Sequence, residues 1–239
     1  ILKRLITKVL IIYKMNNSKK ILDFLKKIKP LKVPNNISIM NPYHNKNIWP
    51  LIKKFYTTYY NDYKRRIIIL GINPGRLGGG LTGIPFTDPY NLEKYCLIDN
   101  SLNKKKEISS KFIYELISIY GGTKKFYNKF FISSVCPFGF IKDNKNFNYY
   151  DNDMILKNWE KKIVEWIEYQ CKNIVRREFC IIIGKGKNEK FFEKINKEYK
   201  FFNEIISLPH PRWILQYRSK QKNIYMKEYI NKLNNINND

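Results

Sequence analysis

The fold of this chain is decided by the stretch Ile67-Ile-Ile-Leu-Gly-Ile-Asn-Pro-Gly-Arg-Leu-Gly-Gly-Gly-Leu-Thr-Gly-Ile-Pro-Phe86. A β-branched apolar run ends at Gly71 and leads into a loop rich in glycine and proline. The run predicts a strand that is buried on both faces, as in a parallel sheet. Five of the 11 glycines of the chain precede Thr82 in this loop, which indicates backbone that turns sharply or approaches another group closely. At a strand end, such a loop is more typical of a site than of a linker.

The rest of the chain alternates between strand-like and helix-like patterns. Together with the run at 66–70, apolar runs predict strands at 130–135, 179–183 and 203–208. Helical spacing of apolar residues predicts helices at 18–29, 49–60, 109–120, 153–171, 188–200 and 221–233, with Asp153 as an N-cap. This alternation predicts an α/β fold: a three-layer αβα sandwich around a central, mainly parallel sheet of four strands.

The length and composition predict a single domain. The chain has 239 residues, 44% of them hydrophobic, and shows no internal repeat and no linker, so we assign one domain to 15–239. Met15 precedes the first expected helix, and we interpret residues 1–14 as upstream readthrough or a disordered extension. No apolar run is long enough to span a membrane, and the apolar start lacks a cleavage site. We expect a cytoplasmic monomer associated with the bacterial nucleoid.

The charge indicates a class of binding partner, and the cysteines indicate the redox compartment. There are 45 Lys and Arg against 20 Asp and Glu, a net charge of +25, which favours a polyanionic partner such as nucleic acid. The abundance of Lys, Asn and Ile also fits AT-rich codon usage, so the charge alone does not establish DNA binding. The four cysteines form no C-x-x-C pair, and we interpret them as buried thiols of a reducing compartment.

Three loops follow expected strands and should meet at one rim of the sheet. They span 71–86, 136–140 and 209–218, and ligands of parallel sheets bind beyond the carboxyl ends of the strands. The first loop has neither the G-K-[ST] ending of a P-loop nor the G-x-G-x-x-G spacing of a dinucleotide site. Acidic residues are scarce on this rim, which argues against metal-bound phosphate; Asp88 either binds Mg²⁺ or caps the next helix.

Two polar residues on this rim have both a functional and a structural interpretation. Asn73 either belongs to a site or merely caps its own turn. His210 stands between two prolines just after the last strand, which predicts a rigid loop that presents the imidazole. The other histidine, His44, is interpreted as structural. The segment 212–218 adds arginines and aromatic rings that suit phosphates and unstacked bases.

The ordered motifs resemble a known family. Gly71-Ile-Asn-Pro-Gly75 and Thr82-Gly-Ile-Pro-Phe86, with His210-Pro211 at the end of the last strand, resemble the motifs of the uracil-DNA glycosylase superfamily, closest to its single-strand-selective monofunctional (SMUG-like) branch. The strand residues Phe131-Ile-Ser-Ser-Val-Cys-Pro137 occupy the place of the strand that reads the base. The resemblance spans about 66–218.

The resemblance implies a monofunctional DNA glycosylase of base-excision repair that needs no cofactor and no metal. Such an enzyme flips a uracil or a related deaminated or damaged base out of single- or double-stranded DNA and hydrolyses its N-glycosidic bond. By resemblance, Asn73 positions the attacking water and His210 donates to the base. The implied base-binding residues are Ile72, Phe86 and Ser134, and the implied DNA-binding residues are Gly75, Arg76, Gly78, Gly79, Arg212, Trp213 and Arg218.

The sequence departs from the family pattern at two places. Ser134 stands where the family has a base-reading Asn, and a single hydroxyl discriminates a pyrimidine edge less than an amide does. The family pattern His-Pro-Ser-Pro-Arg is shortened here to His210-Pro-Arg212, so the loop that enters the duplex must differ. The base and the strand preference therefore stay open. A non-catalytic nucleic-acid-binding module remains an alternative, as does a nucleotide-handling α/β enzyme.

Overall fold

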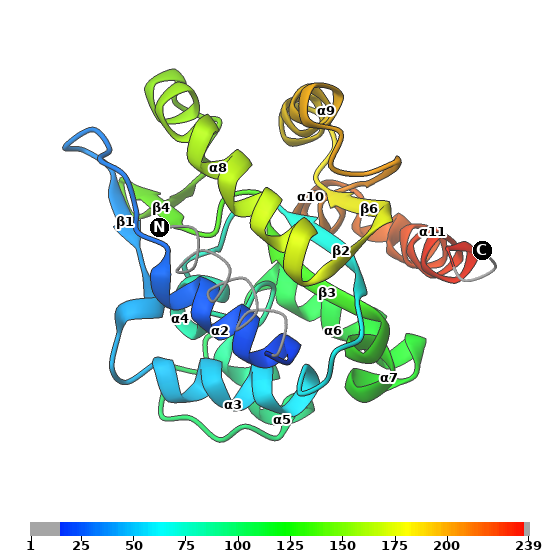
Figure 1. Cartoon of the computed structure of the whole chain (residues 1–239). Helices are drawn as coiled ribbons and strands as arrows, with labels where there is room; N and C mark the ends of the chain where they lie inside the picture. Colours follow the sequence, from blue (N-terminus) through cyan, green and yellow to red (C-terminus); the bar gives the residue numbers. More distant parts are fainter. Residues whose placement is uncertain (1–14, 237–239) are drawn as a thin grey trace.

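The structure is a computed structural model that describes residues 15–236. The interpretation of residues 1–14 as readthrough lies outside the described residues. The large sheet has four parallel strands in the order β3 (Phe130–Ser134), β2 (Arg66–Gly71), β6 (Val175–Ile183) and β7 (Glu204–Leu208), with helices on both sides (Figure 1). The three-layer α/β sandwich expected from the sequence is confirmed.

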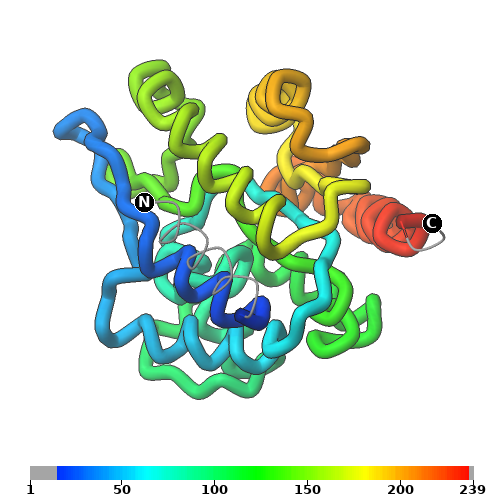
Figure 2. Tube along the Cα trace, viewed as in Figure 1, coloured from blue at the N-terminus to red at the C-terminus, as the bar shows by residue number. Residues whose placement is uncertain are grey.

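One layer of helices covers the face of the sheet that carries Phe131. It consists of α2 (Asn17–Lys27), α3 (Trp49–Tyr59) and α8 (Asp153–Asn173). Helices α2 and α8 are far apart in sequence but lie side by side (Figure 2), with the rings of Phe24 and Tyr169 stacked at 5.1 Å. Tyr60, just after α3, packs its ring edge on Phe131 at 5.5 Å.

The second layer covers the opposite face. It contains α6 (Ile108–Tyr120), α7 (Gly122–Lys129) and α11 (Lys222–Asn235). Phe126 of α7 packs on Phe130 at 5.0 Å, and Phe112 of α6 packs on Tyr229 of α11 at 5.2 Å. The remaining helices are α4 (Gly79–Thr82), α5 (Pro89–Cys96), α9 (Lys187–Tyr199), α10 (Pro211–Tyr217) and the short 3₁₀ helices η1 (Pro42–His44) and η2 (Ser219–Gln221).

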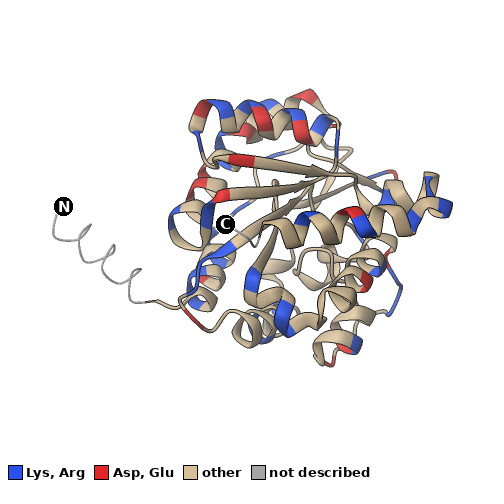
Figure 3. Cartoon of the chain, turned by 90° about the vertical axis from the view of Figure 1, so that its right-hand side faces the viewer, with Lys and Arg blue, Asp and Glu red and all other residues tan. Residues whose placement is uncertain are grey.

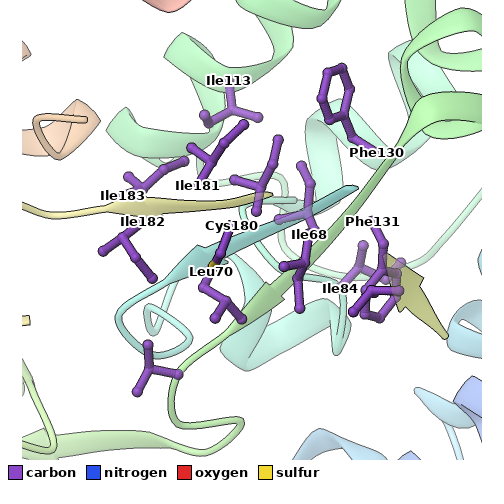
Figure 4. Packing of buried hydrophobic residues seen from close by; sticks show 14 of the residues in the cluster. Ile68, Leu70, Ile84, Ile113, Phe130, Phe131, Cys180, Ile181, Ile182 and Ile183 are labelled. Carbon is purple, nitrogen blue, oxygen red and sulfur yellow. The ribbon is translucent and has the colours of Figure 1, made fainter. Parts of the chain in front are cut away.

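Side chains of the sheet alternate between the two layers, as the pleat of a strand requires. In Figure 4, Ile181 points to the side of Ile113 on α6, whereas Ile182 points to the opposite side. All six residues of β2 are buried, which explains why its residues 67–70 are continuously apolar rather than alternating. The four cysteines are buried free thiols, as expected.

A second, small sheet was not expected from the sequence. It is antiparallel, with the order β1 (Ser38–Met40), β4 (Gly139–Lys142) and β5 (Lys145–Phe147). Its strands have only three or four residues and carry polar and glycine residues, so they lack the apolar run that marks a strand. This sheet lies at the carboxyl ends of the large sheet, since β4 follows β3 within a few residues.

Some local expectations differ from the structure. The N-cap of α8 is Asn152, whose side chain accepts from the N–H of Ile155 at 3.0 Å; Asp153 is the first helical residue instead. The segment after His210, expected as a loop, forms α10, because Pro211 suits the first position of a helix. Among residues 15–236, no helix combines the length and the apolar composition that crossing a bilayer requires.

All four strands of the large sheet point the same way, so their carboxyl ends share one edge (Figure 3). The register pairs Gly71, the last residue of β2, with Ser134, the last residue of β3. On the other side, Leu208 at the end of β7 pairs with Ile183 of β6. The three loops expected on one rim therefore start at the same edge of the sheet.

Candidate active site

A cavity of about 460 Å³ opens at the carboxyl ends of the large sheet. This volume lies within the range of small-molecule and cofactor sites. Two of the three expected rim loops, 71–86 and 209–218, line the cavity, whereas the loop 136–140 contributes no residue to it. Ser134 at the end of β3 and two segments that were not expected there complete the lining: Gly71, Ile72, Asn73, Pro74, Gly75, Arg76, Leu77, Phe86, Lys106, Glu107, Ile108, Ser109, Ser134, Lys145, Asn146, Asn148, His210, Arg212, Trp213, Gln216 and Tyr217.

Asn73 is held by the segment that follows the small sheet. Its Nδ2 donates to the carbonyl of Phe147 at 3.2 Å, and its Oδ1 accepts from the N–H of Tyr149 at 3.3 Å. The partners lie 74 and 76 positions away, so these two bonds do not belong to a local turn cap. Because an amide oxygen accepts two hydrogen bonds, Oδ1 keeps one acceptor position for a ligand or water in the cavity.

Phe86 forms one wall of the cavity in a constrained backbone conformation. Its φ is 53°, in the left-handed region that is uncommon for residues other than glycine. The turn before it is held by Thr82, whose hydroxyl donates to the carbonyl of Thr87 at 2.7 Å and accepts from the N–H of Ile84 at 3.1 Å. These bonds close a loop around Phe86, which places the half-buried ring next to the end of β2.

Ser134 and Ile72 contribute to the inner part of the cavity. Ser134 ends β3 and is 5% exposed, and it has no side-chain hydrogen bond to any other part of the described chain. Its hydroxyl can therefore turn to donate to, or accept from, a ligand. The backbone at Ile72 is held by two hydrogen bonds: the carbonyl oxygens of Gly71 and Ile72 accept from the N–H groups of Val135 and Cys136 at 2.9 and 3.1 Å.

His210 caps the helix that follows it, which fixes its tautomer. Its Nδ1 accepts from the backbone N–H of Arg212 at 3.1 Å, so Nδ1 carries no proton. The proton of the neutral ring is on Nε2, for which residues 15–236 supply no acceptor. Burial, with a smaller contribution from the positive charge of Arg212, lowers the pKa of His210 to about 4. At neutral pH the ring is a neutral Nε2–H donor.

Phe86 and His210 are neighbours across the cavity. Their ring centroids are 5.9 Å apart, with an interplanar angle of 41°. His44, in contrast, has both ring nitrogens engaged outside the cavity, with the carbonyl of Lys26 at 3.0 Å and the side chain of Asn41 at 3.4 Å. These contacts agree with the structural role expected for His44.

The cationic and aromatic residues of α10 lie at the mouth of the cavity. Arg212, Trp213 and Tyr217 line it and are exposed, and Arg76 lies on the same lining. Arg218 does not line the cavity; its guanidinium lies over the ring of Trp213 at 5.5 Å. This mouth offers exposed cations and a flat ring to an anionic, aromatic ligand.

The loop glycines make room for other parts of the protein. A β-carbon on Gly75 or Gly78 would overlap with the carboxyl oxygens of Glu107, and one on Gly79 would come 3.1 Å from the carbonyl oxygen of Ile84. Of these three glycines, only Gly75 lines the cavity. The N–H of the next residue, Arg76, donates to Oδ1 of Asn146 at 2.9 Å.

Glu107 and the β5 segment are the site residues that sequence reasoning missed. Glu107 directly precedes α6 and lines the cavity, although few acidic residues were expected on this rim. The sequence signal that could have identified it is its position, between the three lysines at 104–106 and the helix expected at 109–120. Asn146 and the backbone of Phe147 and Tyr149 were missed because the small sheet was not expected.

Asp88 does not point to a metal site. It caps α5, with its carboxylate accepting from the N–H of Asn91 at 2.7 Å and from the N–H of Glu107 at 2.8 Å. Of the two interpretations left open by the sequence, the helix cap is the one that this geometry supports.

The family model of the Uracil DNA glycosylase superfamily matches residues 57–234. The chain belongs to the uracil-DNA glycosylase superfamily. Among solved structures it is similar to wild-type SMUG2 of Pedobacter heparinus, with 43% sequence identity, a TM-score of 0.89, and coverage of 94% of this chain and 100% of that chain. No curated protein matches the sequence.

Membership of the uracil-DNA glycosylase superfamily confirms the resemblance stated from the motifs. The SMUG2 match supports the SMUG-like branch, and its coverage extends beyond the part of the chain that carries the motifs. In this superfamily member, an amide oxygen, a neutral imidazole N–H, a hydroxyl and an aromatic ring meet in one cavity. Such a set can hold a flat heterocycle, donate a hydrogen bond to it and place a water molecule near it.

Proposed function

We propose that this protein is a monofunctional DNA glycosylase of base-excision repair. It hydrolyses the N-glycosidic bond of uracil, or of a related deaminated base, after the nucleotide has been flipped out of DNA. The observation that carries the proposal is the convergence of Asn73, Phe86, Ser134 and His210 on one cavity from separate strand ends. The superfamily match and the similarity to SMUG2 of Pedobacter heparinus support it.

The main catalytic contribution is assigned to His210. As the glycosidic bond breaks, electrons flow into the base and negative charge develops on its carbonyl oxygen. The Nε2–H of a neutral imidazole donates a hydrogen bond to that oxygen in the transition state, where it is worth more than in the ground state. The hydrogen bond from Arg212 N–H to Nδ1 keeps the proton on the correct nitrogen.

Asn73 is assigned to the attacking water. Its Oδ1 accepts from Tyr149 N–H and has a further acceptor position for a proton of the water. An amide is a weak base, so it orients the water rather than deprotonating it. This fits a dissociative reaction in which the departure of the base precedes the attack on an oxocarbenium-like sugar.

Phe86 and Ser134 are assigned to the base itself. The ring of Phe86 stacks on the flipped base, and the hydroxyl of Ser134 bonds to the edge of the base. A hydroxyl both donates and accepts, so it accommodates uracil as well as a deaminated purine. Ile72 supplies apolar contact in the same cavity.

DNA binding is assigned to the mouth of the cavity. Arg76, Arg212 and Arg218 are exposed cations there or beside it, and Trp213 offers a ring that can replace the stacking of the flipped base. The net charge of +25 favours association with a polyanion at low salt.

The decisive test is base release from labelled oligonucleotides that contain uracil, xanthine or hypoxanthine, in single- and double-stranded form, followed by alkali. We expect alkali-labile sites without strand cleavage by the protein itself. Asn73→Ala and His210→Ala should each lower the rate about 100-fold or more while DNA binding changes little. Asn47→Ala, at an exposed position, and His44→Ala are the matched controls. Binding without release of any base would replace the proposal by the non-catalytic module.

A further inference from the structure

The carboxyl group of Glu107 is a half-buried acid that the proposed chemistry does not use. Its backbone N–H donates to Oδ2 of Asp88 at 2.8 Å, and its side chain does not cap α6 but turns to the cavity. There, its two oxygens lie against the α-carbons of Gly75 and Gly78, where a β-carbon would overlap with them. Within the described residues, no donor forms a hydrogen bond with either oxygen.

Charges from several elements surround this carboxyl. Asp88 faces it from the start of α5, and Arg212 faces it from α10. Lys106 on its own segment, Arg76 on the glycine turn and Lys145 on β5 line the same cavity. Burial and the negative charge of Asp88 raise the pKa of Glu107 to about 7, although the positive charge of Arg212 opposes the shift.

An ionised Glu107 would oppose DNA in two ways. DNA would bring a phosphate to the turn that contains Gly75 and Arg76, and a carboxylate packed against the same turn would repel it. The carboxylate would also attract Arg212, which the proposed function assigns to DNA. Protonation removes both effects while leaving the packing of the carboxyl group on Gly75 and Gly78 intact.

We propose that Glu107 is a positioning residue that supports the glycine turn as a neutral carboxylic acid and takes up a proton from solvent when DNA docks. The inference rests on the proposed function for the identity of the ligand. By linkage, a ligand that binds the protonated form more tightly must itself raise the protonated fraction. DNA affinity should therefore fall as the pH rises above about 7.

The test is the pH dependence of binding to a fluorescent duplex with a tetrahydrofuran abasic-site analogue, from pH 6 to 9 at constant ionic strength. We expect the Kd of the unmodified protein to rise above pH 7, with a slope approaching tenfold per pH unit, as for one linked proton. Glu107→Gln keeps the shape of the neutral acid, so its Kd should stay low and lose this slope. Glu165→Gln on α8, outside the cavity, should keep it.

Proton uptake by the unmodified protein provides a second measurement that does not depend on the folding of any variant. Calorimetry of DNA binding at pH 8 in buffers of different ionisation enthalpy should reveal an uptake approaching one proton per complex. No uptake, an unchanged slope in Glu107→Gln, or loss of binding in that variant would each overturn the inference. Base release is measured separately: failure to release any base would contradict the proposed glycosylase while leaving the pH-dependent binding to be judged on its own.

Discussion

The ring of Phe86 lies directly on the backbone of Gly71. A β-carbon added to Gly71 would come 2.6 Å from Cε2 of Phe86. Gly71, the last residue of β2, leaves this space free for the ring. The position of the ring also depends on the left-handed backbone conformation of Phe86 itself. The position of the proposed stacking wall is thus set by a residue of the sheet.

Gly71→Ala should displace this ring. Since a shift of about 1 Å in a catalytic site can cost about 100-fold in rate, we expect kcat/KM to fall by at least about tenfold. The extra methyl group should also lower the free energy of unfolding by about 1–3 kcal/mol, measured by urea denaturation. Gly122→Ala, on α7 and outside the cavity, is the control for activity: its β-carbon meets nothing within 4 Å, but its φ of 89° strains an alanine, so the free energy of unfolding should fall while kcat/KM stays unchanged. Full activity of Gly71→Ala would show that the position of the ring is unimportant.

Asn73→Asp should be slower than the unmodified protein although a carboxylate is the stronger base. The carbonyl of Phe147 accepts from Nδ2 of Asn73 at 3.2 Å, and a carboxylate oxygen in that place would be repelled. We expect kcat to fall about 10- to 100-fold, measured in single-turnover reactions. Asn47→Asp controls for the added charge. A faster Asn73→Asp variant would mean that proton abstraction from water limits the rate.

His210 should titrate far below the ordinary histidine range. Nitrogen NMR across pH 3 to 8 should give a pKa of about 4 and, at neutral pH, an unprotonated Nδ1. In the unfolded chain the ring takes up its proton near pH 6.5, so between about 6.5 and 4 the unfolded state binds more protons. The free energy of unfolding should therefore decrease as the pH falls through this window, less so in His210→Gln. A His210 pKa near 6.5 would contradict the desolvation of the ring, and a protonated Nδ1 at neutral pH would contradict the assigned tautomer.

Ser134→Asn should narrow the range of bases that are released. An amide presents a donor and an acceptor in fixed positions, which matches a pyrimidine edge, whereas a hydroxyl adapts to several edges. We expect the ratio of kcat/KM for uracil to that for xanthine or hypoxanthine to rise about tenfold, the equivalent of one hydrogen bond. Ser133→Asn, at the preceding position of β3, is the control. An unchanged ratio would show that Ser134 does not contact the edge of the base.

Much of the fold was predictable because the strands of the large sheet contain apolar runs, which are buried throughout in the central strand β2. The runs at 66–70, 130–135, 179–183 and 203–208 correspond to β2, β3, β6 and β7. The helix expected at 49–60 is α3, Trp49–Tyr59, and the helix expected at 109–120 is α6, Ile108–Tyr120. The small sheet was not predictable from such patterns, since short, half-exposed strands with polar residues carry no periodic signal.

The family and the order of the site residues can be read from local sequence: a strand, an Asn-containing glycine turn, a strand ending in Ser134, and a histidine after the last strand. Local chemistry is sufficient for these, because apolar runs and glycine turns act over a few residues. How the site side chains are held depends on contacts between distant parts of the chain. Asn73 is oriented by backbone groups 74 and 76 positions away, and Glu107 reaches Gly75 and Gly78 from the start of another helix. Contacts of that range arise from chain packing, which no local pattern encodes.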